Sequence, residues 1–149
     1  MEVLIKRLSK DGLEQSAMPF YATPGSAGMD LSAQIVEPMV LKKGALAVIP
    51  TGLAIALPSA DYVAYLYARS GLGVRHGICL SNGVGVIDSD YRGEICVGLV
   101  NLGPADYTIM PGERIAQLVF APVVRAELIE TDELPDSRRG SGGFGSTGR

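Results

Sequence analysis

The chain has 149 residues, of which 47% are hydrophobic, and it carries 13 Lys and Arg against 16 Asp and Glu, for a net charge of −3. This length predicts one compact domain. The acidic balance disfavours a protein that coats nucleic acid, because neutralising phosphates needs a basic excess. No stretch approaches the roughly 20 apolar residues that span a bilayer, and the N-terminus lacks the apolar core of a secretory signal. We therefore expect a soluble, cytoplasmic protein that binds neither nucleic acid nor membranes.

The two cysteines, Cys79 and Cys96, are too few for a disulfide framework, and the one histidine leaves a zinc site of the usual kind short of ligands. This count favours buried free thiols. A small anionic ligand stays possible, because it needs only a local cluster of arginines. The arginines available for such a cluster are Arg69, Arg92, Arg114, Arg138 and Arg139.

Short strands are predicted along most of the chain, because 19 glycines and 9 prolines interrupt it and leave no long apolar run at helical spacing. Several runs are rich in β-branched or aromatic residues or alternate with a period of two. In chain order, the predicted strands cover residues 3–8, 45–49, 53–57, 62–67, 95–102 and 115–120. One helical turn is expected at residues 69–77, where the alternation lapses. The pattern predicts an all-β domain, a jelly roll or a related barrel.

The end of the chain differs in composition from the rest. After an acidic stretch at residues 127–136, arginine, glycine and serine dominate, a composition that cannot form a core. We expect a domain over residues 1–136 and a flexible glycine-rich tail over residues 137–149. The tail reads either as a disordered end or as a functional segment, because Phe144 offers a stacking ring beside phosphate-type donors.

The densest polar segment, residues 81–94, combines glycines that permit close backbone approach to a ligand with acids that suit a base or a hard cation. A hairpin turn with solvated acids is an equally open reading. Residues 69–72 offer a guanidinium, a hydroxyl and a backbone N–H in succession, which suits phosphate oxygens. The glycine–lysine pattern of a P-loop is missing there, which disfavours ordinary kinase or ATPase chemistry.

Five short segments, taken together in their order along the chain, are far more specific evidence of function than any one of them alone. They cover residues 27–31, 69–72, 83–94, 112–118 and 139–148. Together they resemble the five ordered motifs of the trimeric dUTPase family. The resemblance implies a jelly-roll-like β-clip barrel and a homotrimer with active sites between subunits. It also implies Mg²⁺-dependent hydrolysis of dUTP to dUMP and pyrophosphate, which lowers dUTP and supplies dUMP for thymidylate synthesis.

By this resemblance, Asp88 matches the catalytic acid and would activate the water that attacks the α-phosphorus. Mg²⁺ would be held mainly by the substrate phosphates and by water. Asp30 would receive hydrogen bonds from those waters, or it would be a strand-end carboxylate with structural bonds. Arg114 would contact phosphate, or it would form a structural ion pair. Both pairs of readings stay open.

The remaining motif positions match substrate contacts of the family. The implied phosphate contacts are Arg69, Ser70, Gly71 and Gln117, joined by Arg139, Gly145, Ser146 and Thr147 from the tail. The positions that would read uracil are Asn82, Val86, Ile87 and Cys96, with Phe144 stacked on the base. Tyr91 would lie against the deoxyribose and leave no space for a 2′-hydroxyl. Cytosine would be rejected because its donor and acceptor pattern is reversed.

Two alternatives compete with this reading. A dCTP deaminase would share the fold and parts of the phosphate site, but Asp88 and the tail with Phe144 fit the pyrophosphatase pattern better. A catalytically inactive nucleotide-binding regulator, or a trimeric interaction module, belongs to a different class, and the intact Asp88 argues against it.

Overall fold

The computed structural model describes residues 1–8 and 15–143, and strands dominate this part of the chain. The elements are β1 (Leu4–Arg7), β2 (Phe20–Tyr21), β3 (Met29–Ser32), β4 (Met39–Leu41), β5 (Leu46–Pro50), β6 (Leu53–Ala56), β7 (Tyr62–Ala68), α1 (Ser70–His76), β8 (Ile78–Leu80), β9 (Gly85–Ile87), β10 (Cys96–Asn101), β11 (Tyr107–Ile109) and β12 (Arg114–Pro122). The predicted all-β class is confirmed. The predicted helical turn is α1, which ends where Gly77 takes a left-handed φ of 71°.

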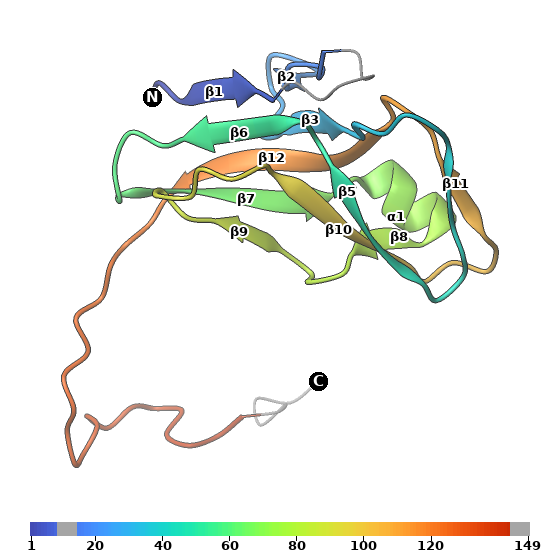
Figure 1. Ribbon diagram of the computed structural model, residues 1–149. Helices are drawn as coiled ribbons and strands as arrows, with labels where there is room; N and C mark the ends of the chain where they lie inside the picture. Colours follow the sequence, from blue (N-terminus) through green and yellow to red (C-terminus); the bar gives the residue numbers. More distant parts are fainter. Residues whose placement is uncertain (9–14, 144–149) are drawn as a thin grey trace.

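In the described residues, the strands form four small sheets, with strand orders β2-β3-β12-β7-β9, β5-β10-β8, β1-β6 and β11-β4. The long strand β12 lies between β3 and β7 and pairs antiparallel with both. The buried side chains of these sheets form a hydrophobic core cluster, and Figure 1 shows α1 beside β8. Every sheet contributes aliphatic side chains that are almost fully buried, among them Leu31, Leu41, Ile49, Leu53, Val97, Leu99, Ile109 and Leu118. Their burial supplies the main driving force for this fold.

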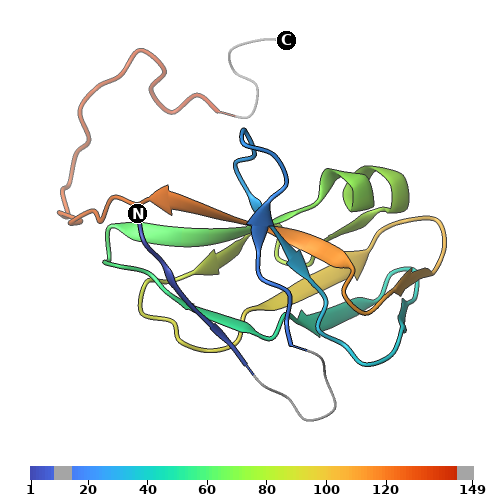
Figure 2. The same ribbon diagram turned by 90° about the horizontal axis from the view of Figure 1, so that it is seen from above.

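The chain leaves the body after β12. Residues 123–143 contain no helix or strand and run away from the sheets in both views (Figures 1 and 2). Large apolar side chains in this segment are exposed to solvent: Val124 is 92% exposed and Leu128 is 93% exposed. Within residues 1–8 and 15–143, no helix is long and apolar enough to cross a membrane.

Candidate active site

The first cavity of interest has a volume of about 270 Å³ and contains Asp88 in its wall. Its lining is Leu66, Asn82, Gly85, Val86, Ile87, Asp88, Tyr91, Glu94, Ile95 and Cys96. We call it the Asp88 cavity. It gathers the predicted base together with the predicted uracil and sugar contacts, namely Asn82, Val86, Ile87, Tyr91 and Cys96. Glu94 belongs to the predicted polar segment 81–94 but had no role of its own, and Leu66 and Ile95 were not predicted as site residues, because their only sequence signals were those of strands.

A glycine allows the strand before Asp88 to lie close to its neighbour. β9 pairs antiparallel with β7, so that Gly85 stands opposite Leu66 and Ile87 opposite Ala64. A Cβ at Gly85 would lie 2.8 Å from the Cβ of Leu66. A larger residue would therefore push the two strands apart. Asp88 follows directly after a strand that this close packing fixes.

The turn that carries Asp88 is held by its own hydrogen bonds. The backbone N–H of Tyr91 donates to the carbonyl of Asp88 at 3.1 Å. The Arg92 Nη1 donates to the carbonyls of Ser89 and Tyr91, at 2.8 and 2.9 Å. The Glu94 carboxylate accepts a bond of 2.8 Å from the backbone N–H of Gly52, which ties the far end of the loop to β6. Arg92 was one of the arginines available for an anion cluster, and its guanidinium braces this turn.

A second cavity, of about 200 Å³, lies at the junction of β7 and α1. Its lining is Ala22, Ser26, Gly28, Asp30, Arg69, Ser70, Gly71, Arg114 and Gln117. We call it the Arg69 cavity. It brings together the phosphate contacts predicted for the body of the protein, Arg69, Ser70, Gly71 and Gln117. Ser26 and Ala22 were not predicted, although Ser26 stands next to the first motif segment in the sequence.

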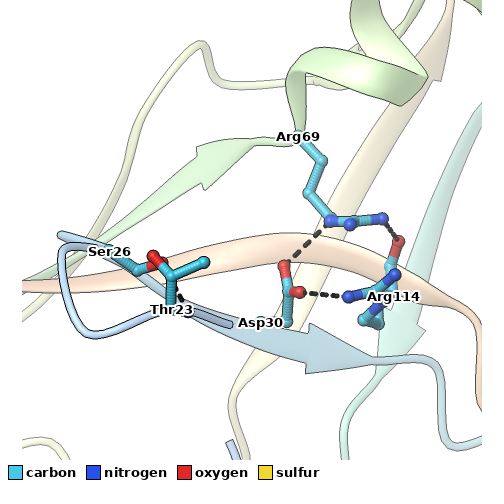
Figure 3. A network of polar contacts seen from close by, with 5 residues as sticks. All are labelled: Thr23, Ser26, Asp30, Arg69 and Arg114. Atoms are coloured by element: carbon cyan, nitrogen blue, oxygen red, sulfur yellow. Dashed lines mark hydrogen bonds and ion pairs between the residues drawn. The ribbon is translucent and has the colours of Figure 1, made fainter. Parts of the chain in front are cut away.

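Asp30 is shared between two arginines at the edge of the Arg69 cavity (Figure 3). Its Oδ1 accepts from Arg69 Nε at 2.8 Å, and its Oδ2 accepts from Arg114 Nη1 at 2.9 Å. Arg69 Nη1 also donates to the Arg114 carbonyl at 3.0 Å. The Asp30 side chain is only 10% exposed, against 26% for Arg69 and 46% for Arg114. Two guanidiniums share one carboxylate, which leaves a net positive charge suited to an anion.

Gln117 comes from β12 and stands opposite Asp30 in the β12–β3 register. Its Nε2 donates to the carbonyl of Ala68 at 3.2 Å, which directs it toward the end of β7. A Cβ at Gly28 would lie 3.2 Å from both the Cβ and the Oε1 of Gln117. Glycine at position 28 therefore leaves room for the Gln117 side chain.

The loop that leads into β12 is fixed by Tyr107 and Glu113. The hydroxyl of Tyr107 donates to one Glu113 carboxylate oxygen, and the backbone N–H of Met110 donates to the other at 2.9 Å. Burial, together with the hydrogen bond to Glu113, raises the pKa of Tyr107 to about 12. Tyr107 thus stays a neutral donor at physiological pH, and the loop before Arg114 keeps its shape.

The predicted tail residues lie away from both cavities or beyond the described chain. Arg139 is exposed and lines neither the Asp88 cavity nor the Arg69 cavity. Phe144, Gly145, Ser146 and Thr147 lie outside the described residues. The prediction of buried thiols is wrong for Cys96, which is exposed at the start of β10, while Cys79 is half-buried. The reason is that β10 turns Cys96 toward an outer face and not into the core.

In the described ranges 1–8 and 15–143, no three or more His, Cys, Asp or Glu side chains are grouped so that they could hold a metal ion. Asp30, predicted to contact Mg²⁺ through water, has both carboxylate oxygens bonded to arginines. That metal contact stays a prediction. The structural ion pair that was one reading of Arg114 is present, and it does not prevent a second contact to an anion.

Known proteins resemble the chain over nearly its full length. The family model described as dUTPase matches residues 14–148. The deoxyuridine 5'-triphosphate nucleotidohydrolase of Desulfitobacterium hafniense is 49% identical over 148 residues, covering 99% of this chain and 97% of its own. The enzyme of the same name from Sodalis glossinidius is 51% identical over 145 residues, covering 97% and 96% of the two chains.

The fold agrees with this match. The solved dUTPase of Staphylococcus bacteriophage 80alpha with dUPNHPP superposes with a TM-score of 0.86, at 30% identity, over 99% of both chains. The family match, the relatives and the two cavities built from the ordered motifs all indicate a dUTPase. This chain belongs to the dUTPase family, and it hydrolyses dUTP to dUMP.

Proposed function

We propose that Asp88 is the general base of this hydrolysis and activates a water for attack on the α-phosphorus, which releases pyrophosphate. The support is positional: Asp88 directly follows a fixed strand, stands on a braced turn and lines the cavity that also contains the proposed nucleoside contacts. General-base assistance of this kind contributes typically about 100- to 10,000-fold in rate. The remaining acceleration comes from holding the triphosphate in line with the water.

The uracil ring enters the Asp88 cavity. Its N–H and two carbonyl oxygens pair with Asn82 and with the backbone of Val86, Ile87 and Cys96, the residues of its wall. Cytosine presents the reversed donor and acceptor pattern, so that buried polar groups would be left unpaired. Such a mismatch discriminates strongly. Tyr91 borders the same cavity and closes it on the sugar side, which disfavours a 2′-hydroxyl.

The triphosphate binds in the Arg69 cavity. Arg69 and Arg114 supply the positive charge, and Ser70 and Gln117 supply neutral donors. Gly71 gives a further indication, because a Cβ there would meet nothing within 4 Å and its φ is not in the left-handed region. Neither packing nor backbone conformation within this chain requires glycine at that position. A phosphate that approaches the Gly71 backbone from outside the chain supplies the missing reason.

The active site forms between copies of the chain, in a homotrimer. The Asp88 cavity and the Arg69 cavity share no lining residue. Ile87 stands opposite Ala64 near the start of β7, whereas Arg69 follows the end of β7. Five residues of extended strand span about 16 Å, too far for both side chains to serve the same phosphate. Asp88 of one copy and Arg69 of another can meet on one substrate.

An apolar sheet face supports this assembly. Leu46 and Val48 of β5 are each 69% exposed. On the paired strand β10, Val100 stands opposite Leu46 and Gly98 opposite Val48. Cys96 stands two residues before Gly98 on β10. An exposed apolar face of this kind is typical of a subunit interface. Because Cys96 also lines the Asp88 cavity, the face and the cavity are adjacent, as a site between subunits requires.

Mg²⁺ is the metal that we assign to the reaction. Its preferred ligands are oxygens, and it commonly binds through substrate phosphates with several waters retained. The triphosphate provides those oxygens, so the protein needs no cluster of acids. When bound, the ion neutralises phosphate charge, while Arg69, Ser70 and Gln117 fix the position of the chain of phosphates.

Replacing Asp30 with asparagine is expected to raise the KM for dUTP about tenfold, because a hydrogen bond to a charged group contributes roughly 1.5–3 kcal/mol. Arg69 and Arg114 would lose the anion that orients both. Inhibition by deoxyuridine, which has no phosphate, should not change. Steady-state kinetics at several Mg²⁺ concentrations measure both the KM for dUTP and the inhibition by deoxyuridine. If excess Mg²⁺ restored the KM, Asp30 would act through the metal and not through the arginines. Asp106→Asn, at an exposed acid bonded to the Lys43 backbone N–H, is the matched control.

A substrate panel tests the proposed function as a whole. Purified protein with Mg²⁺ is mixed separately with dUTP, dCTP, dTTP, UTP and dATP, and the release of both pyrophosphate and ammonia is followed. Pyrophosphate from dUTP alone is the expected result. Ammonia from dCTP would assign the chain to the deaminase branch of the fold. Binding of dUTP without release of either product would identify a nucleotide-binding regulator.

A further inference from the structure

The ring of Tyr91 lies across its own turn, although the residue is 45% exposed. Its hydroxyl donates to the backbone carbonyl of Glu94 at 2.9 Å. Its backbone N–H donates to the carbonyl of Asp88. One residue thus spans the loop from the predicted base to the start of β10. The ring borders the Asp88 cavity, so the position of the ring sets the shape of one wall of that cavity.

The ring can take this place only because residue 93 has no side chain. A Cβ on Gly93 would lie 2.4 Å from the Tyr91 hydroxyl oxygen and 2.6 Å from its Cζ. Gly93 is not among the glycines with positive φ, so its backbone conformation suits any residue. Glycine at position 93 therefore leaves a space, and the Tyr91 ring fills it.

The rest of the loop cannot absorb such a contact. Arg92 braces the turn through the carbonyls of Ser89 and Tyr91. On the far side, the Glu94 carboxylate is bonded to the backbone N–H of Gly52. Because the backbone is held at both ends, the Tyr91 ring is the part that must move. Ordinary contact begins near 3.4 Å, so the hydroxyl would shift by about 1 Å.

We infer that Gly93 is a positioning residue for sugar selectivity: by leaving room for the Tyr91 ring, it holds the ring where a ribose 2′-hydroxyl would otherwise fit. This rests on the proposed role of the Asp88 cavity as the nucleoside site. Gly93 itself does not touch the substrate. It acts through Tyr91, whose hydroxyl bond to Glu94 and packing over Gly93 fix one ring position. A displaced ring opens the sugar side of the cavity and admits the ribonucleotide.

The test compares kcat/KM for dUTP and UTP in the wild type and in Gly93→Ala. We expect the preference for dUTP over UTP to fall about tenfold or more, since displacements near 1 Å at a site have effects of this size. An equal loss on both substrates, or an unchanged preference, would overturn the inference. Gly73→Ala is the control, because a Cβ there meets nothing closer than 3.8 Å.

A double-mutant cycle shows whether Gly93 acts through Tyr91. In a Tyr91→Ala background, Gly93→Ala should cause no further change in the preference. An additional loss of the same size in that background would contradict the mechanism. If Gly93→Ala does not fold, Tyr91→Phe decides, because it removes the bond to Glu94 and adds no atoms. A lowered preference in Tyr91→Phe supports the inference, and an unchanged one overturns it.

The binding of dUMP and UMP, measured by calorimetry, separates this inference from the proposed catalysis. If the wild type did not hydrolyse dUTP, the role of Asp88 would fail. The ratio of the two affinities would still report on Gly93. A fall of that ratio in Gly93→Ala supports the inference without any turnover, and an unchanged ratio overturns it.

Discussion

Asp88→Asn should lower kcat for dUTP by about 100- to 10,000-fold, the usual contribution of a positioned general base. Asparagine keeps the size of the side chain but cannot take a proton from water. The turn should persist, because its bonds come from the Asp88 carbonyl and from Arg92, not from the carboxylate. The KM and the binding of a non-hydrolysable dUTP analogue should therefore change little.

Two measurements separate this loss of chemistry from a loss of structure. Single-turnover kinetics at saturating dUTP report the chemical step directly, and calorimetry with the analogue reports binding. Asp106→Asn should keep the wild-type rate, because Asp106 is exposed and borders neither cavity. A kcat within a few-fold of wild type in Asp88→Asn would remove Asp88 from the role of base. A proportional loss of analogue binding would make it a substrate contact instead.

The strands were predictable where the sequence is rich in β-branched or aromatic residues or alternates with a period of two. The strands expected near β1, β5, β6, β7, β10 and β12 are all present within two residues of their predicted ends. Those that were missed, such as β2 (Phe20–Tyr21) and β9 (Gly85–Ile87), have two to four residues. Their positions depend on pairing with other segments of the chain, which the local sequence pattern does not show.

The site was predictable from motif order but not from local chemistry. Residues 69–72 and 81–94 carried recognisable donors and acids, and each group lines one cavity. The sharing of Asp30 by two arginines could not be foreseen, because it joins β3, β12 and the residue after β7, which are far apart in sequence. The role of Gly93 was also hidden, since a glycine kept for space looks the same in sequence as one kept for its φ.

Deleting residues 139–149 is expected to lower kcat/KM for dUTP by about 100-fold or more, because loss of even one preorganised phosphate donor has effects of this size. Residues 139, 140, 141 and 143 are exposed and residue 142 is half-buried, so residues 139–143 contribute little to the core. The melting temperature of the truncated protein should therefore stay near that of the full chain. We expect the loss to come from donors that close over the bound triphosphate, Arg139 and the residues after Gly143.

A replacement of the same length tests the chemistry of the tail apart from its reach. Changing residues 139–149 to a glycine–serine segment keeps the chain length and removes the arginines and Phe144. If the side chains act on the substrate, this variant should be as impaired as the truncation. If it were as active as the full chain, the tail would be a linker. Loss of thermal stability in both variants, in step with activity, would instead make residues 139–149 part of the assembly between subunits.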